Sequence, residues 1–231
     1  SEEDHLLDPG AETPGERLVT PPAIDPLARR LALTQLTLAW GRAVRDNPEI
    51  LAIDGDEPLL IPASAADATR LAADLARLMD DVETAADLAS GHDHWQAIRD
   101  LAPDDHAAYF QVTLEFLKIA FEAWPAFLGG QNVVDPAVRR DTLIRAAADR
   151  LARGPRRGPV IAAGSTGTIP ATAALLKTIA WLPDGAVVLP GLDRDLDAAG
   201  FAAIGGIDTE ARTQGHPQFG LKQLIAAIGV T

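Results

Sequence analysis

The chain has 231 residues, of which 47% are hydrophobic and 23% charged, a composition typical of folded globular proteins and not of disordered chains. No stretch approaches about 18 consecutive apolar residues, so the sequence predicts no membrane-spanning segment. The net charge of −13 argues against binding of a polyanion over the whole surface, because affinity for nucleic acid depends on neutralising phosphates. Any contact with DNA is therefore expected to be local.

The chain contains no cysteine, which excludes disulfides, thiolate metal sites, iron–sulfur ligation and cysteine nucleophiles. This composition agrees with a reducing compartment, and we expect a cytoplasmic protein. Met79 is the single methionine, and the acidic start Ser-Glu-Glu-Asp has no secretory pattern. We therefore expect the chain to be a piece of a longer protein.

Proline and glycine punctuate residues 1–22 without an apolar period, which predicts an arm or linker. Apolar residues at helical spacing then predict four helices, which cover about residues 25–46, a stretch that opens at residue 64, residues 103–128 and a stretch that opens at residue 135. Aspartate followed by proline, at Asp25 and Asp135, predicts two helix starts, and the Ser64 hydroxyl predicts a third. Residues 23–157 are thus predicted to form a helical subdomain.

The first helix has its apolar residues at spacings of three and four. The stripe expected to be buried comprises Leu27, Leu31, Thr34, Leu38 and Val44.

The pattern changes at residues 154–159, a segment rich in glycine and proline that predicts a hinge. Val160–Ala163 and Ala186–Leu189 are short apolar runs typical of buried strands, and a helix is expected between them over about residues 170–181. This order predicts a parallel βαβ unit, followed by a helix over about residues 216–228. The predicted fold class is α/β and mostly helical, with residues 158–231 forming a partial α/β domain.

A glycine-rich turn that includes Gly164, Ser165, Thr166 and Gly167 follows the first predicted strand, where an open α/β sheet normally binds its ligand. A phosphate-binding P-loop would need a lysine within this turn, but the next lysine is Lys177. A tight structural turn is the simpler interpretation.

The same turn is one residue away from a nucleophile elbow, and Asp193 and His216 follow Ser165 in the order of an α/β-hydrolase triad. A small serine hydrolase is therefore an alternative, although the preceding residues are helical and supply no earlier strands for its sheet.

Three histidines, His92, His94 and His106, lie close together in sequence. They lack a further ligand at a recognisable spacing, so we expect a polar turn, no metal and no cofactor.

One basic cluster interrupts the acidic trend, and its members are Arg139, Arg140, Arg145, Arg150, Arg153, Arg156 and Arg157. At 100° per residue, Arg139, Arg150 and Arg153 lie on one helix face, opposite Ile144 and Leu151. This arrangement predicts contact with DNA phosphates or with an acidic partner. A solvated helix face is the alternative, and so is a pure protein-interaction module.

Several long strings resemble the AddB family, the second subunits of AddAB-type helicase–nucleases that process DNA double-strand breaks for recombinational repair. They are VIAAGSTGTIPATAALLK at residues 160–177, GAVVLPGLD at residues 185–193, HPQFGLK at residues 216–222, PPAIDP at residues 21–26 and TLEFLK at residues 113–118. The resemblance covers nearly the whole chain and implies an internal piece of the amino-terminal half, similar in plan to UvrD-type helicases.

In that plan, the strand before Pro170 ends in the Asp-Glu pair that binds Mg²⁺, but Ala163 and Gly164 occupy the matching positions here. After the next strand, the chain has no glutamine to sense the γ-phosphate before Gln214. The resemblance therefore implies a degenerate, non-catalytic helicase segment that serves as scaffold and contacts DNA or an AddA-type subunit, the active motor. The family's nuclease domain, with its iron–sulfur cysteines, would lie outside this chain.

Overall fold

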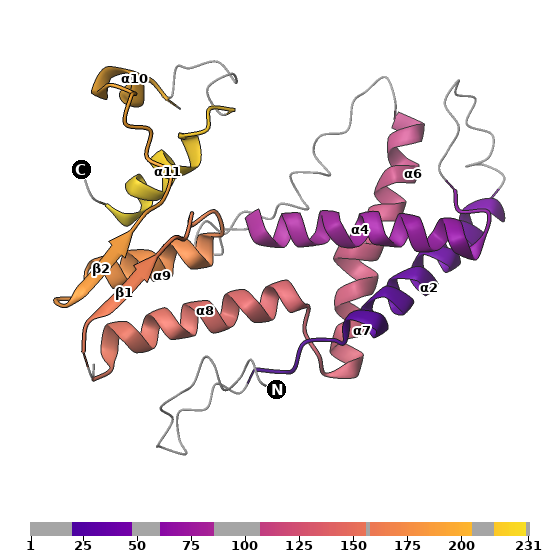
Figure 1. Cartoon of the computed structure of the whole chain (residues 1–231). Coiled ribbons are helices and arrows are strands. Elements are labelled where there is room, and N and C mark those ends of the chain that lie inside the picture. Colours follow the sequence, from indigo (N-terminus) through magenta and orange to yellow (C-terminus); the bar gives the residue numbers. More distant parts are fainter. Residues whose placement is uncertain (1–19, 48–60, 86–106, 156–157, 205–214, 230–231) are drawn as a thin grey trace. The chain divides into compact units, whose positions relative to one another are not determined.

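A computed structural model gives the structure of the protein (Figure 1). It describes residues 20–47, 61–85, 107–155, 158–204 and 215–229. Helices dominate and a two-stranded parallel sheet accompanies them, which confirms the predicted mostly helical α/β class. Among the described residues, no helix is long and apolar enough to cross a membrane.

The described residues divide into two compact units. We call Thr20–Arg139 the helical unit and the described residues from Arg140 onward the α/β unit. The division lies within one helix, whereas the sequence analysis places the boundary between residues 157 and 158. Most of the predicted arm at residues 1–22 lies outside the described residues.

The helical unit consists of helical segments that follow one another along the chain (Figure 1). They are α2 (Pro26–Arg45), α4 (Ala65–Ala85), α6 (Ala107–Lys118), the π-helical segment η2 (Ile119–Ala123), α7 (Trp124–Gln131) and the start of α8 (Pro136–Arg153).

Side-chain caps begin three of these helices, as the sequence predicts. Asp25 accepts hydrogen bonds from the backbone N–H groups of Leu27 and Ala28 at 2.9 and 3.0 Å. The Ser64 hydroxyl accepts from the Asp67 N–H at 3.1 Å, and the Asp67 carboxylate accepts from the Ser64 N–H at 3.1 Å, which completes a reciprocal capping box. Asp135 begins α8 by accepting from the Ala137 N–H at 3.1 Å.

The buried face of α2 agrees with the predicted stripe only at Val44, which is buried. Leu27 and Leu31 are 63% and 55% exposed, whereas Leu33 and Thr37 are buried and face the core together with Gly41. Apolar residues surround much of α2, so their spacing alone does not select a face. A small residue is required at position 41, where an added Cβ would lie 2.7 Å from Pro62 Cγ.

One continuous helix was predicted over residues 103–128, but a π-helical turn interrupts it at Ile119–Ala123. There the Trp124 N–H donates to the Ile119 carbonyl, five residues back. Pro125 follows at once and has no N–H to donate to the Phe121 carbonyl, so a regular α-helical ladder cannot continue through this point. Such widened turns often occur at functional sites.

The α/β unit contains β1 (Val160–Ala163), α9 (Pro170–Ala180), β2 (Gly185–Val188), α10 (Ala198–Ala203) and α11 (Phe219–Ile228). The strands pair in parallel with Val160 opposite Gly185 and Ala163 opposite Val188, so the predicted βαβ unit is confirmed. Helix α10 was not predicted.

Successive side chains of each strand point alternately to a covered face and to an open face of the sheet. Ala162 and Val187 pack against a cluster formed by Leu176 of α9 with Leu224 and Ile228 of α11. On the other face, the large apolar side chains of β1 and β2 are exposed. Parallel sheets usually have both faces covered, so this sheet presents an incomplete layer.

Candidate functional site

Glycines determine the conformation of the turn after β1. Gly164 and Gly167 have φ values of +81° and +58°, a region that side chains rarely adopt. A Cβ on Gly167 would lie 2.5 Å from Leu224 Cδ1, and the Gly164 N–H donates to the Val188 carbonyl at 3.0 Å. Both glycines are therefore explained by packing and turn geometry.

No acidic side chain stands at the end of β1 or in the turn that follows it. The strand ends at Ala163, Gly164 follows, and the nearby Ser165 hydroxyl accepts a hydrogen bond from the Gly167 N–H at 3.3 Å. Thr166 is exposed. The turn thus offers hydroxyl groups and backbone N–H groups but neither a cation nor a carboxylate.

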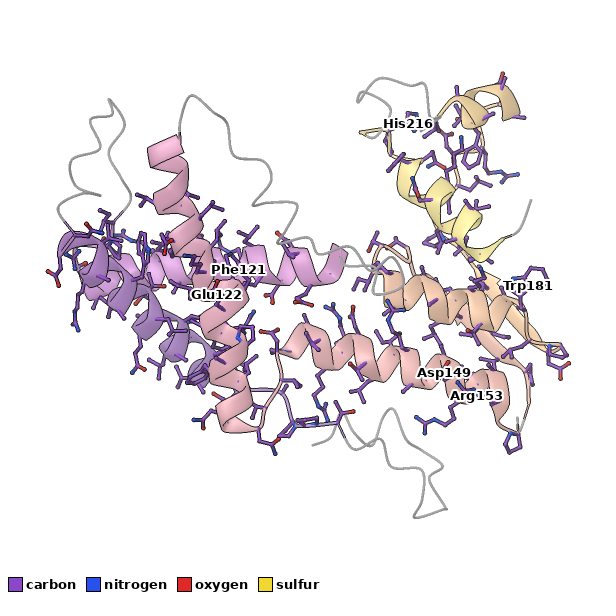
Figure 2. All side chains as sticks on the ribbon, turned by 180° about the vertical axis from the view of Figure 1, so that it is seen from behind. Phe121, Glu122, Asp149, Arg153, Trp181 and His216 are labelled. Carbon is purple, nitrogen blue, oxygen red and sulfur yellow. The ribbon has the colours of Figure 1, made fainter. Side chains whose placement is uncertain are left out.

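The three residues of the hydrolase alternative are each engaged within their own loops. His216, labelled in Figure 2, uses Nδ1 to accept from the Gln218 N–H at 3.1 Å. Asp193 accepts from the Asp195 N–H at 2.9 Å, and Ser165 accepts from Gly167 as described. A triad needs the histidine Nδ1–H to donate to the aspartate. In the described geometry, Nδ1 is an acceptor instead.

Gln218 is a structural residue of this region that the sequence analysis did not identify. Its buried side chain donates from Nε2 to the Gly191 carbonyl at 2.7 Å and accepts at Oε1 from the Asp193 N–H at 3.1 Å. It therefore ties the loop after β2 to the start of α11. Its place within the string HPQFGLK was the available signal, but the contact is long-range and cannot be read from spacing.

The described part of the basic cluster lies along α8. Arg150 and Arg153 are exposed, and Arg153 forms an ion pair with Asp149 at 3.2 Å, one helical turn away (Figure 2). Arg140 pairs with the buried Asp141 at 2.8 Å. Arg139 is half-buried, so only Arg150 and Arg153 of the predicted stripe are exposed, and Arg156 and Arg157 lie outside the described residues.

The two units differ in net charge. Residues 20–139 contain 9 lysines and arginines against 19 aspartates and glutamates, whereas residues 140–231 contain 10 against 8. Within residues 140–157 there are six arginines and two aspartates. The basic charge is therefore concentrated at α8 and directly after it.

A buried ionic network, also missed by the sequence analysis, organises the helical unit around Asp135. This carboxylate accepts from Trp124 Nε1 at 3.1 Å and pairs with Arg29 at 3.1 Å, in addition to capping α8. Arg29 also makes a two-pronged interaction with Asp80, at 2.8 and 3.2 Å. The network joins α2, α4, α7 and α8 through directional contacts.

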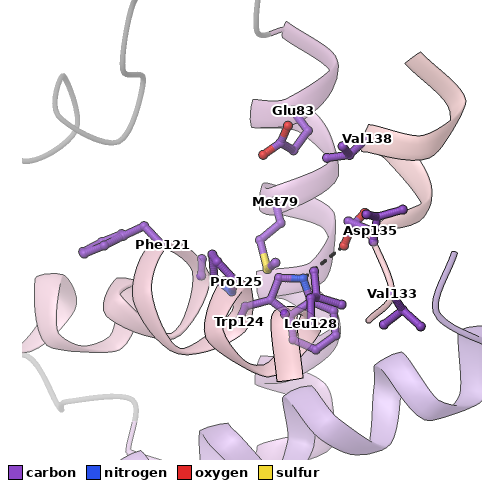
Figure 3. Close-up of a pocket in the computed structure, with 12 residues that line it drawn as sticks. Met79, Glu83, Phe121, Trp124, Pro125, Leu128, Val133, Asp135 and Val138 are labelled. Atoms are coloured by element: carbon purple, nitrogen blue, oxygen red, sulfur yellow. Dashed lines mark hydrogen bonds between the residues drawn. The ribbon is translucent and has the colours of Figure 1, made fainter. Parts of the chain in front are cut away.

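A pocket of about 420 Å³ lies beside this network, and Figure 3 shows it between α4, α7 and the start of α8. Met79, Trp124, Leu128 and Val133 give it an apolar lining, and Phe121 and Pro125 belong to it as well. The widened turn at η2 thus contributes directly to the pocket wall.

The histidines at positions 92, 94 and 106 lie outside the described residues. In the part of the chain that the structure describes, no group of three or more potential metal-ligating side chains occurs. No family model, curated protein or solved structure matches the chain.

Proposed function

We propose that the chain is a non-catalytic, helicase-like segment of an AddB-type subunit, acting in the cytoplasm in the repair of DNA double-strand breaks. The proposal rests on the resemblance of the strings at residues 160–177, 185–193 and 216–222 to that family. The observation that supports a non-catalytic role most directly is the turn after β1. If Pro170 matches the proline that follows the helicase motif, the resemblance puts Ala163 and Gly164 at the positions of the metal-binding carboxylates. The glycines of the turn serve packing and turn geometry.

The charge distribution supports a local contact with DNA at α8. The helical unit is strongly acidic and repels phosphate, whereas residues 140–157 carry an excess of four positive charges. Arg150 and Arg153 are exposed on the same helix, one turn apart. We therefore assign the DNA or partner contact to this part of α8.

The test is fluorescence anisotropy of labelled duplex-end and single-stranded DNA, titrated with the protein at several salt concentrations. The plot of log affinity against log salt has a negative slope. If Arg150 and Arg153 both contact phosphates, the double reversal Arg150→Glu/Arg153→Glu makes this slope less steep by about 2 for duplex DNA. The matched control is Arg70→Glu/Arg77→Glu, because these exposed arginines also form ion pairs within one helix, α4. Unchanged DNA binding in the α8 variant, or an equal loss in the control, contradicts the assignment.

The exposed sheet face favours a second role, contact with another protein. Ile161 and Val188 are 66% and 58% exposed on the open face of the sheet. Two four-residue strands are too few for an independent sheet, so a covering layer would stabilise them. Within the first proposal, the AddA-type subunit is the natural partner for this face.

The serine hydrolase is a separate alternative with a simple test. An activated Ser165 would react with a fluorophosphonate probe, because labelling needs a nucleophile primed by a base. The hydrogen bonds of Ser165 and His216 within their own loops lead us to expect no labelling. Labelling that disappears in Ser165→Ala would establish the hydrolase instead.

A further inference from the structure

One face of α2 carries an apolar stripe that begins in the solvent. Its members, at spacings of four, three and four residues, are Leu27, Leu31, Thr34 and Leu38, all of which belong to the stripe that the sequence predicts to be buried. The structure buries another side of α2 instead and leaves Leu27 and Leu31 63% and 55% exposed. The Thr34 hydroxyl donates to the Arg30 carbonyl at 2.8 Å, so its hydrogen bond is made within the helix.

The spacing of this stripe is that of a seam between two helices. Apolar residues at alternating steps of three and four form a straight row, which packs against a similar row on a facing helix. From Leu27 to Leu38 the row is about 16 Å long, or three helical turns, at about 1.5 Å per residue. Single exposed leucines are common on protein surfaces, whereas an aligned row indicates an interaction surface.

Unpaired arginines lie on both sides of the stripe. In the heptad that the leucines define, Arg30 and Arg42 occupy the flanking positions that face charged residues of a partner helix. Both are exposed, and neither guanidinium forms an ion pair or a hydrogen bond within the described parts of the chain. The other two arginines of α2 are engaged, Arg29 with two carboxylates and Arg45 with a backbone carbonyl.

The charge of α2 favours an acidic partner. Residues 26–45 contain four arginines and no aspartate or glutamate. A second copy of this helix would bring only arginines and neutral side chains to the seam, so it would give Arg30 and Arg42 no acceptor. Glutamates at the flanking positions of a different helix would pair with both arginines, because charges at these positions determine the choice of partner.

We propose that this face of α2 binds an amphipathic helix of a partner protein, through a row of leucines or similar apolar residues flanked by glutamates. The proposal does not depend on the AddB assignment, because it uses only the exposure, spacing and charge of α2. The partner helix would bury the stripe that the rest of the helical unit leaves exposed.

The probe is a fluorescein-labelled peptide of three heptads, with leucine at the seam positions and glutamate at both flanking positions. Like charges at the flanking positions oppose association of the peptide with itself. Matched peptides carry lysine in place of the glutamates, or alanine in place of the leucines. Fluorescence anisotropy with the full chain should give saturable, micromolar binding of the glutamate peptide and about tenfold weaker binding of each of the others. Absent binding, or equal affinity for the three peptides, overturns the proposal.

Two single substitutions test the seam. Leu31→Asp places a carboxylate in the middle of the stripe and should weaken binding of the glutamate peptide about tenfold. Leu192→Asp is the matched control, because Leu192 is similarly exposed, at 60%, and lies in the α/β unit. The control should bind the peptide like the wild type, and circular dichroism checks that both variants are folded. Equal losses in the two variants contradict the assignment to α2.

A double substitution tests the preference for acidic partners. Arg30→Gln/Arg42→Gln should bring the affinities for the glutamate and lysine peptides to within about twofold of each other, because the cations that distinguish them are removed. Arg70→Gln/Arg77→Gln removes two exposed arginines of α4 that pair within their own helix, and it should keep the full difference. An unchanged preference for glutamate in the α2 variant contradicts the proposal.

Three other occupants of this face would overturn the proposal, and each gives its own result. A change in the sedimentation coefficient of Leu31→Asp without peptide would identify a second copy of the chain. Binding of the wild type to anionic lipid vesicles that is lost in Leu31→Asp would identify a membrane surface. Peptide binding that becomes about tenfold tighter on deletion of residues 1–19 would identify that segment as the occupant.

Discussion

Removing the Asp135 carboxylate should destabilise the helical unit more than any single surface change. Asp135 is 6% exposed and serves three partners, the Trp124 indole N–H, the Ala137 N–H and Arg29. Loss of a helix cap costs about 1 kcal/mol, and a buried donor left without an acceptor costs about 1–3 kcal/mol. Breaking a buried ion pair from one side costs about 3–5 kcal/mol, but Arg29 keeps its contact with Asp80. These contributions overlap, so we expect about 3–4 kcal/mol for Asp135→Ala.

Urea unfolding followed by far-ultraviolet circular dichroism measures this loss. With an m value of about 2 kcal/mol/M, the midpoint should fall by about 1.5–2 M. Asp135→Asn keeps one oxygen, which can accept from the Ala137 N–H or from Trp124 but not from both in this geometry, and it should lose less than Asp135→Ala. Asp149→Ala, which breaks an exposed ion pair, should change stability by less than about 0.5 kcal/mol. A loss below about 1 kcal/mol for Asp135→Ala would refute the role of the network.

Two further predictions concern turn geometry and pH. Gly167→Ala should lower the free energy of unfolding by about 1–3 kcal/mol, because φ is +58° and the new Cβ would meet Leu224. Gly220→Ala, which has open space around its new Cβ in α11, should not destabilise the protein. Equal urea midpoints for Gly167→Ala and the wild type would contradict this prediction. The hydrogen bond from Ser64, with a smaller contribution from Arg70, lowers the pKa of Asp67. Its stabilising effect is thus complete above the unfolded pKa of about 4 and is lost as pH falls through the lower folded value, so the stability difference between wild type and Asp67→Asn should shrink in acid, and a constant difference would contradict this.

Local signals in the sequence were sufficient for the caps and the βαβ unit. Asp25, Ser64 and Asp135 each begin a helix through hydrogen bonds to residues two or three positions away, so spacing alone reveals them. The strands are short apolar runs separated by a helix, and connection rules then require parallel pairing.

The features that were missed depend on distant parts of the chain. The face of α2 that is buried follows from the contact of Gly41 with Pro62, and not from leucine spacing. The π-helical turn has a local cause in Pro125, yet the helical periodicity on either side conceals it. The Asp135 network joins residues more than 100 positions apart, and only its capping bond could be predicted.

The turn after β1 and the pocket of the helical unit also differ in whether the sequence reveals them. The turn at Gly164 to Gly167 could be located from sequence because it follows a strand directly, and its lack of a lysine or carboxylate is visible there too. The pocket beside Trp124 could not be found, since its lining comes from three separate segments of the chain, residues 79–83, 120–129 and 133–138.

Sedimentation velocity of the protein mixed with an AddA-type subunit tests the central proposal most directly. If the chain is a scaffold segment of an AddB-type subunit, the two should sediment together at micromolar concentrations, and the complex should weaken when Ile161→Asp/Val188→Asp alters the exposed sheet face. Independent sedimentation of the two proteins across the whole concentration range would contradict the account.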